Sequence, residues 1–245
     1  MDWSRAKSVL ILAFLVLNIL LGYQLWMDEL NLSNFSKNAA KREEMSRLLD
    51  LKNIQLQTAV PEGMPVLNDI TVSLQINTQE MEWQPLDRPI PVTVLQDRAQ
   101  LLSALHQQLP MIDEYETDRS VRGASGTTMI MNQLYEGLPM FPIKLELTGQ
   151  GSLLTLYRVL YVKVEPAEGE KSVGQEVLSA YTVLGNLAEY YLPQDSIVTD
   201  IRLGYHGPIF ESETQVLAPY WRVLLKTGET YYVHAVTGAV EGPPA

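Results

Sequence analysis

Three histidines, a serine among glycines and several close carboxylate pairs are the residues of this chain that could take part in chemistry. His106, His206 and His234 lie far apart in the sequence. None of them belongs to a pattern such as H-E-x-x-H, in which two side chains can bind one metal ion. We therefore expect ordinary surface or half-buried histidines and no metal site.

Patterns for nucleophilic catalysis or phosphate binding are also missing. Ser125, in the segment GASG, does not form a G-x-S-x-G elbow. Gly149 and Gly151 fall in an expected hairpin and not before the N-terminus of a helix. The carboxylate pairs are Asp195 with Asp200 and Glu211 with Glu213, and we expect them to form a solvated acidic face. The sequence thus predicts a protein that is not an enzyme and that holds no cofactor.

The composition limits the classes of partner that the protein is expected to bind. The chain has 245 residues, of which 46% are hydrophobic, a formal net charge of -11 and no cysteine. Without cysteine, the fold must be held by packing alone. With an acidic balance and no basic stripe, binding to nucleic acid is not expected, because such binding depends on neutralising phosphates. Protein is the expected partner.

The first structural element that the sequence predicts is an apolar stretch at the N-terminus. From Val9 to Trp26 there is no charged residue. About 18 helical residues rise about 27 Å, close to the thickness of a hydrocarbon core. Arg5 and Lys7 precede the stretch, and positive charge is retained on the cytoplasmic side. We expect a single transmembrane helix over 9–26, with the N-terminus in the cytoplasm and the rest of the chain outside the cell.

The alternative to an anchor is a cleavable signal peptide, which needs small residues just before the cut. The segment GYQLW at the end of the stretch offers no such site, so the sequence favours the uncleaved anchor.

One face of this helix has the character of a partner contact. Gly22 allows close approach of another helix, and Asn18 can form a hydrogen bond across the interface. A lipid-facing Asn18 is the alternative. The residues that share the face by their spacing are Ile11, Leu15, Asn18, Gly22 and Leu25.

The next expected element is an amphipathic helix, Ala39–Asp50, with Met45, Leu48 and Leu49 on its apolar side. Such a side usually packs on the sheet of its own chain. A parallel coiled coil with a partner is the alternative.

The remaining pattern is that of helices followed by antiparallel strands. Helices are expected over Arg98–Leu109 and Gln175–Leu192, and a solvated loop over Asp113–Ser125. Residues 77–91 are expected to form an irregular connection, with a short edge strand as the alternative. Strands are expected over Ile54–Val60, Ile70–Ile76, Thr127–Tyr135, Phe141–Leu147, Leu153–Val164, Ile197–Tyr205, Val216–Lys226 and Thr230–Val236.

The fold class is therefore α+β: one transmembrane helix and an extracytoplasmic region of two helix-plus-antiparallel-sheet units. The expected parts are a cytoplasmic N-terminus (1–8), the transmembrane helix (9–26), a juxtamembrane segment with the amphipathic helix (27–52), a first unit (53–165), a linker (166–174) and a second unit (175–245).

Three segments carry a resemblance to a known family. The start MDWSRAK running into ILAFLVLNILLGYQLW, the following ELNLSNFS, and the terminal WRVLLKTGETYYVHAVTGAVEG resemble YycI proteins. The terminal segment also resembles the hairpin of PepSY-like modules. The resemblance implies a protein of Gram-positive bacteria that spans the membrane once and has no catalytic motif.

The same resemblance implies partners. YycI proteins act with the related YycH on the essential sensor histidine kinase WalK (YycG), which governs cell-wall metabolism, and contacts among transmembrane helices are central. A homodimer is a further possibility. The alternative functions are an envelope scaffold or PepSY-like inhibitor of a cell-wall enzyme or protease, and a hydrolase with an unrecognised nucleophile.

Overall fold

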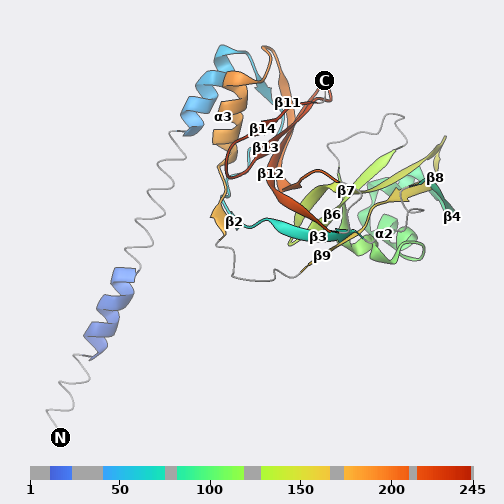
Figure 1. Ribbon diagram of the computed structural model, residues 1–245, viewed down its shortest axis with the longest axis horizontal. Helices are drawn as coiled ribbons and strands as arrows, with labels where there is room; N and C mark the ends of the chain where they lie inside the picture. Colours follow the sequence, from blue (N-terminus) through green and yellow to red (C-terminus); the bar gives the residue numbers. More distant parts are fainter. Residues whose placement is uncertain are drawn as a thin grey trace, which may run out of the picture.

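The computed structural model describes residues 12–23, 41–74, 82–118, 128–165, 174–209 and 214–243. Two helices cover 12–23 and 41–51, and two more are α2 (Arg98–His106) and α3 (Ala180–Tyr190). Short 3-10 helices are η2 (Val92–Gln96) and η3 (Pro110–Glu114). The remaining described structure is mostly strand, so the α+β class is confirmed (Figure 1).

The described residues contain fourteen strands. They are β1 (Gln55–Leu56), β2 (Val66–Leu67), β3 (Ile70–Leu74), β4 (Gln84–Pro91), β5 (Tyr115–Thr117), β6 (Met129–Tyr135), β7 (Leu138–Gln150), β8 (Leu153–Val159), β9 (Val162–Val164), β10 (Gln175–Glu176), β11 (Ile197–His206), β12 (Thr214–Leu225), β13 (Thr230–His234) and β14 (Val240–Glu241).

Twelve of these strands form one sheet that joins the two halves of the chain. Its main path is β14-β13-β12-β11-β7-β6-β5; β8 pairs with β7 and β4, and β3 pairs with β12 and β9. The halves meet where β11 runs parallel to β7, with Tyr205 opposite Met140. Gly204 is required at this crossing, because an added Cβ would lie 2.4 Å from the Pro139 carbonyl oxygen and 2.7 Å from the Phe141 ring.

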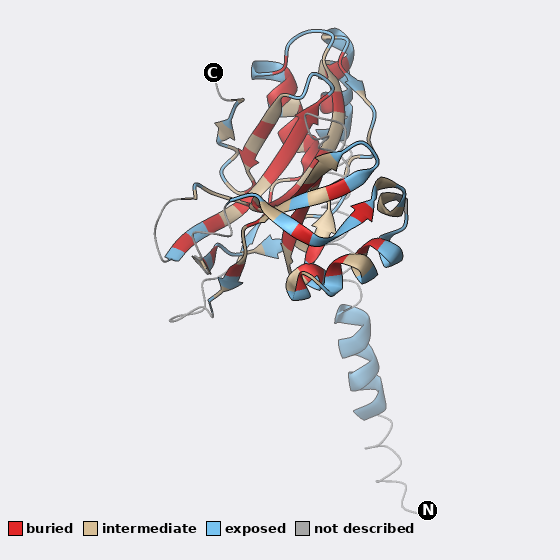
Figure 2. Ribbon diagram, turned by 90° about the vertical axis from the view of Figure 1, so that its right-hand side faces the viewer, coloured by how far each residue is buried: buried red, intermediate tan, exposed pale blue. Residues whose placement is uncertain are grey.

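Each half has its own helix and core (Figure 2). In the C-terminal half, α3 and the helix at 41–51 pack on the same face of β11–β13, with Leu184, Leu187, Trp221 and Val233 fully buried. In the other half, α2 covers β6–β8 through residues such as Leu105. A third cluster lies at the junction of the halves and includes the buried Tyr205.

The helix at 41–51 packs on its own chain, as predicted. Met45 and Leu49 are buried in the core that contains α3. Polar contacts continue along α3: Lys41 Nζ donates to Thr182 Oγ1 at 2.9 Å, and Lys52 Nζ donates to the Glu189 carbonyl oxygen at 3.1 Å. A lysine at the end of α3 also interacts favourably with the helix dipole.

Several element boundaries differ from those expected. α3 begins at Ala180 and not at Gln175, because the Ser179 side chain caps it while Val177 and Leu178 donate backbone hydrogen bonds to Pro65 and Ala235. The expected strand over Ile54–Val60 is a strand only at β1, which pairs in parallel with β11.

The expected loop over Asp113–Ser125 is wrong in its first part. Residues 113–118 contain the end of η3, the strand β5 and the buried Asp118, and they pack into the core through Tyr115, whose hydroxyl donates to the Leu160 carbonyl oxygen at 2.6 Å. Within 77–91 the edge strand, the alternative to an irregular connection, is observed: β4 has eight residues and pairs with β8 despite its three prolines.

Candidate interaction surfaces

The first candidate surface is the helix at 12–23, whose side chains are all exposed. Its residues are almost entirely apolar, and Leu15 exposes 52% of its surface. Among the described residues, no helix reaches both the length and the apolar character that crossing a membrane requires. The predicted span 9–26 lies outside the described residues except for this helix.

The structure places three of the five predicted face residues on this helix. Leu15, Asn18 and Gly22 follow one another at intervals of three and four residues, so they lie on one side of it. A Cβ added at Gly22 would meet nothing within 4 Å. Ile11 and Leu25 lie outside the described residues.

The second candidate surface is the face of β11–β13 that points away from α3. Strand residues alternate between the two faces, so the neighbours of buried Trp221 and Val233 point to the other side. On that side lies a row of rings that we name the aromatic–histidine row. It consists of His206, Tyr220, Tyr232 and His234, with Glu241 of β14 at its edge.

The rings of this row contact one another in sequence. His206 stacks on Tyr232 with ring centroids 3.8 Å apart and an angle of 3° between the planes. Tyr220 meets the edge of His206 at 5.3 Å and the ring of His234 at 5.0 Å. Such contacts stabilise the pairs beyond the area they bury.

Glu241 joins the strand β14 to this row. Its Oε1 accepts a hydrogen bond from the Tyr220 hydroxyl at 2.7 Å, and its Oε2 lies 3.4 Å from His206 Nε2. Burial and the neighbouring carboxylate raise the pKa of Tyr220 to about 12, so this hydroxyl keeps its proton at physiological pH.

His206 is largely enclosed, with a side chain 19% exposed. Burial lowers its pKa below the ordinary value; the Glu241 carboxylate acts in the opposite direction, and Lys144 lowers the pKa further. Its Nδ1 is buried and has no hydrogen-bond partner among the described residues.

A buried ion cluster extends the row toward the other half of the molecule. The Arg222 guanidinium, with a side chain 3% exposed, binds both oxygens of Asp118 and one oxygen of Asp200, and lies 4.7 Å from the centroid of Phe141. Burial lowers the pKa of Arg222, but the hydrogen bonds and charges of the two aspartates outweigh it and raise the pKa overall. The cluster ties β11 and β12 to the segment that follows β5.

The predicted solvated acidic face is wrong for Asp200. Its side chain is only 14% exposed, because it accepts a hydrogen bond from Arg222 Nη2 at 2.9 Å. Asp195 instead accepts a hydrogen bond from Asn53 Nδ2 on the exposed surface.

The three histidines are surface or half-buried residues, as predicted. His106 is exposed and lies 3.4 Å from Asp113. His234 Nδ1 accepts hydrogen bonds from the backbone of Val236 and Thr237, so its ring stabilises the turn after β13. Among the described residues, no group of three or more histidine or acidic side chains could hold a metal ion.

Sequence reasoning missed the aromatic–histidine row and the ion cluster. The signal for the row was the two-residue spacing of Tyr220 and Arg222 in YWRVLL and of Tyr232 and His234 in TYYVH, which places each pair on one face of a strand. The sequence carried no comparable signal for Asp118, which lies 104 residues from Arg222.

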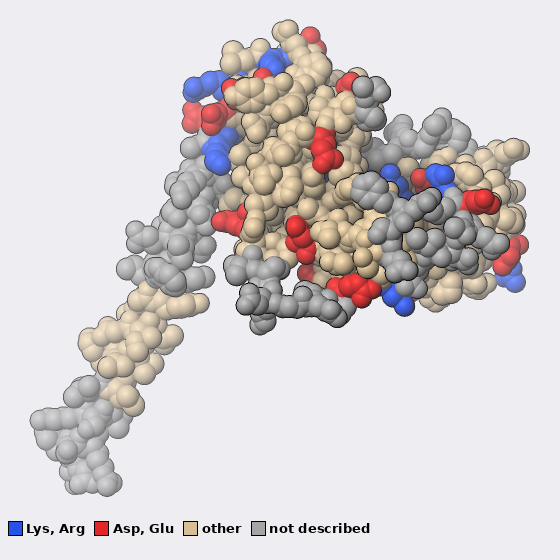
Figure 3. Space-filling view, viewed as in Figure 1, with Lys and Arg blue, Asp and Glu red and all other residues tan. Residues whose placement is uncertain are grey.

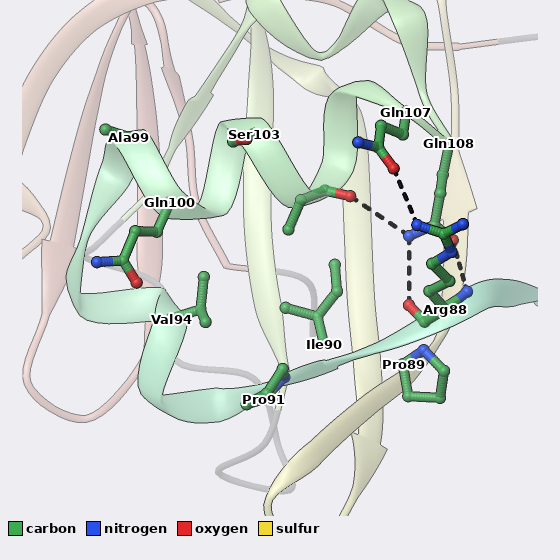
Figure 4. Close-up of a pocket in the computed structure, with 11 residues that line it drawn as sticks. Arg88, Pro89, Ile90, Pro91, Val94, Ala99, Gln100, Ser103, Gln107 and Gln108 are labelled. Carbon is green, nitrogen blue, oxygen red and sulfur yellow. Dashed lines mark hydrogen bonds between the residues drawn. The ribbon is translucent and has the colours of Figure 1, made fainter.

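A cavity of about 630 Å³ lies between β4 and α2 (Figure 4). Ile90, Val94 and Ala104 line its apolar part. At its rim, Arg88 Nη1 donates to Gln107 Oε1 at 3.2 Å, and Gln108 Nε2 donates to the Arg88 carbonyl oxygen at 3.2 Å. These rim groups therefore bind one another, and the cavity offers a mainly apolar lining.

Charge is spread over the folded part. Figure 3 shows acidic side chains scattered over the viewed face. Lysine and arginine side chains occur at several places between them and do not gather in one patch. On this face the described residues form no basic stripe of the kind that tracks a nucleic-acid backbone.

Comparison with known proteins gives one family. A family model described as YycI protein matches residues 27–236. No curated protein is significantly similar to the chain. Among solved structures, an uncharacterized protein from Eubacterium rectale ATCC 33656 is similar with a TM-score of 0.35 and 12% identity, over 85% of this chain and 77% of that chain. A similarity this weak supports no conclusion.

Proposed function

Because this chain belongs to the YycI family, we propose that it is a regulatory protein, without enzymatic activity, of a two-component system. Its partners are a sensor histidine kinase of the WalK (YycG) type and a YycH-like protein, and its effect on the kinase alters cell-wall metabolism. The family match over residues 27–236 is the observation that carries this proposal. The protein spans the cell membrane once, with its N-terminus in the cytoplasm.

The exposed helix at 12–23 supports the part of the proposal that concerns the membrane. Burying a large apolar side chain is worth about 1.5–3 kcal/mol. A run of exposed leucines, a phenylalanine and an isoleucine therefore favours a lipid or protein environment over water. A lipid bilayer would provide the lipid environment, and the transmembrane helices of the kinase would provide the protein environment.

The side of the helix that contains Leu15, Asn18 and Gly22 is the proposed contact with the kinase. Gly22 lets a second backbone approach closely, and a hydrogen bond from Asn18 across the interface is worth about 0.6–2 kcal/mol. Ile11 and Leu25 extend this side by their spacing in the sequence.

Regulation then follows from differential binding. A subunit that binds one signalling conformation of the kinase better than the other shifts the population by that difference in affinity. The folded region contributes by holding the YycH-like partner beside the same kinase.

Point variants of the helix test the proposed face. In cells that contain the kinase, the full chain is isolated in mild detergent, and the recovered kinase is quantified against the recovered chain. Asn18→Leu removes the hydrogen bond, and we expect about 3- to 30-fold weaker association. Gly22→Ile blocks the close approach of the two helices, and we expect it to weaken the association as well.

Ala13→Ile is the matched control, because nine residues correspond to two and a half helical turns and place Ala13 opposite Gly22. This variant should leave recovery unchanged. Equal recovery of the kinase with all three variants contradicts the proposed face. Recovery of a cell-wall enzyme alone favours the scaffold or inhibitor, and recovery of only a second copy of the chain favours a homodimer.

A further inference from the structure

The end of the folded region is fastened by few contacts. β14 consists of two residues, and its cross-strand pairs are Glu241 with Tyr232 and Val240 with Val233. Segments with so few backbone contacts open at a small free-energy cost. Val240 packs against the core that contains α3, and the contacts that Glu241 makes with Tyr220 and His206 add to it in holding β14 in place.

We propose that His206 makes this fastening sensitive to protons: neutral His206 holds β14 and the end of β13 against the sheet, and protonated His206 releases them. We name His206, Tyr220, Tyr232 and Glu241 the C-terminal latch. The proposal concerns the folded region itself and does not depend on which partner the protein regulates.

The geometry favours the neutral ring in the closed latch. Tyr232 stacks on one face of His206, and the Glu241 carboxylate attracts the hydrogen of Nε2. A second proton must then go to Nδ1, which is buried without a partner among the described residues. A buried N–H group without an acceptor is destabilising, because it has lost its hydrogen bond to water and has gained no other.

The charged and titratable groups near His206 act on its protonation in different directions. Glu241 on β14 favours the protonated ring, but its side chain is 56% exposed, so water screens the attraction. Lys144 on β7 disfavours the protonated ring. Tyr220 and Tyr232 stay neutral, because their pKa values are raised. Burial is the largest of these effects, and the pKa of His206 is lowered.

The direction with pH follows from this lowered pKa. An open latch, in which water reaches the ring, has a histidine pKa near 6.5. Above that pH the ring is neutral in both states and the closed latch keeps its full stability. As the pH falls below about 6.5, the open state binds more protons, and opening increases by up to tenfold per pH unit.

Hydrogen–deuterium exchange of the full chain in detergent micelles tests the proposal between pH 7.5 and 5. Rates are normalised to the exchange expected of an unstructured chain at each pH. We expect protection of amides in 230–243 to fall as the pH drops below about 6.5, while amides of β6 and β7 keep theirs. Unchanged protection of 230–243 overturns the proposal.

Three variants separate His206 from its neighbours. His206→Gln cannot take up a proton in this range, and its protection in 230–243 should no longer depend on pH. His206→Phe keeps the stacking on Tyr232 and should behave in the same way, which covers the case that the glutamine variant folds poorly. His106→Gln, at an exposed histidine, should behave like the unchanged chain.

Glu241→Gln distinguishes a titration of His206 from a titration of Glu241. Without the carboxylate the protonated ring loses an attraction, so the loss of protection should move to lower pH. If the glutamate itself were responsible, the pH dependence would vanish in Glu241→Gln and persist in His206→Gln, and the proposal would be overturned.

Discussion

Arg222 connects the two halves of the molecule through a buried ion cluster. It is buried, and its guanidinium is shared between Asp200 of β11 and Asp118, which directly follows β5. A buried charge is tolerated only when it is paired, so removing one partner costs more than the pair contributes. The side chain therefore acts as a structural requirement of this fold.

Arg222→Met should destabilise the chain by about 3–5 kcal/mol, because it leaves Asp118 as a buried charge without its main partner. The measurement is urea unfolding in detergent, followed by circular dichroism. Arg158→Met is the control: Arg158 also pairs with a carboxylate, Glu146, but its side chain is 42% exposed. About 1 kcal/mol is expected there, and equal losses in the two variants contradict a special role for Arg222.

For single residues, the sequence predicted the environment only where a local pattern indicated it. The exposed or half-buried character of the three histidines was predicted, but the contacts of His206 and His234 with Tyr220 were not, because they join three different strands. Asp200 was misplaced, because its partner Arg222 is 22 residues away on the next strand. A residue buried by a distant partner has no local signature.

Among the elements, the helix at 41–51 connects the N-terminal part of the chain to the C-terminal core. Leu49 is 5% exposed and packs with α3, whereas Leu51, two residues later, is 72% exposed. The contacts of Lys41 and Lys52 with α3 hold both ends of the helix. The helix is thus part of the folded region and not a separate stalk.

The same substitution at these two leucines tests this packing. Leu49→Ala should cost about 2–5 kcal/mol, because it removes buried methyl groups and leaves a cavity. Leu51→Ala should change the free energy of unfolding by no more than about 0.5 kcal/mol. Urea unfolding of the isolated chain measures both. A stalk that packs only against a partner would show no loss in either variant.

Most elements could be predicted from their periodicity. β3 was predicted by its alternation and α2 by its leucines, and β11 was predicted as a strand over Ile197–Tyr205. The failures are short strands. β1 and β10 consist of two residues each and pair with strands far away in the chain, and β5 consists of three residues that pair with the following strand, β6. Local periodicity does not contain that information.

For the whole molecule, the fold class followed from the sequence, but the joining of the halves did not. Two helix-plus-sheet units were expected in succession, and their boundary at 166–174 stays a prediction. The structure adds that β3 lies between β9 and β12 and that β7 meets β11, so one sheet runs through both. Pairings between strands far apart in the chain are set by tertiary packing.

The central claim is that the N-terminal helix both anchors the protein and contacts the kinase. Its most direct test replaces residues 1–26 by an unrelated transmembrane span of equal length, keeps residues 27–245 unchanged, and measures the sensor kinase recovered with the chain from mild detergent. We expect the exchanged chain to stay in the membrane fraction and to lose most of the kinase. Recovery of the kinase equal to that of the unchanged protein would contradict the claim.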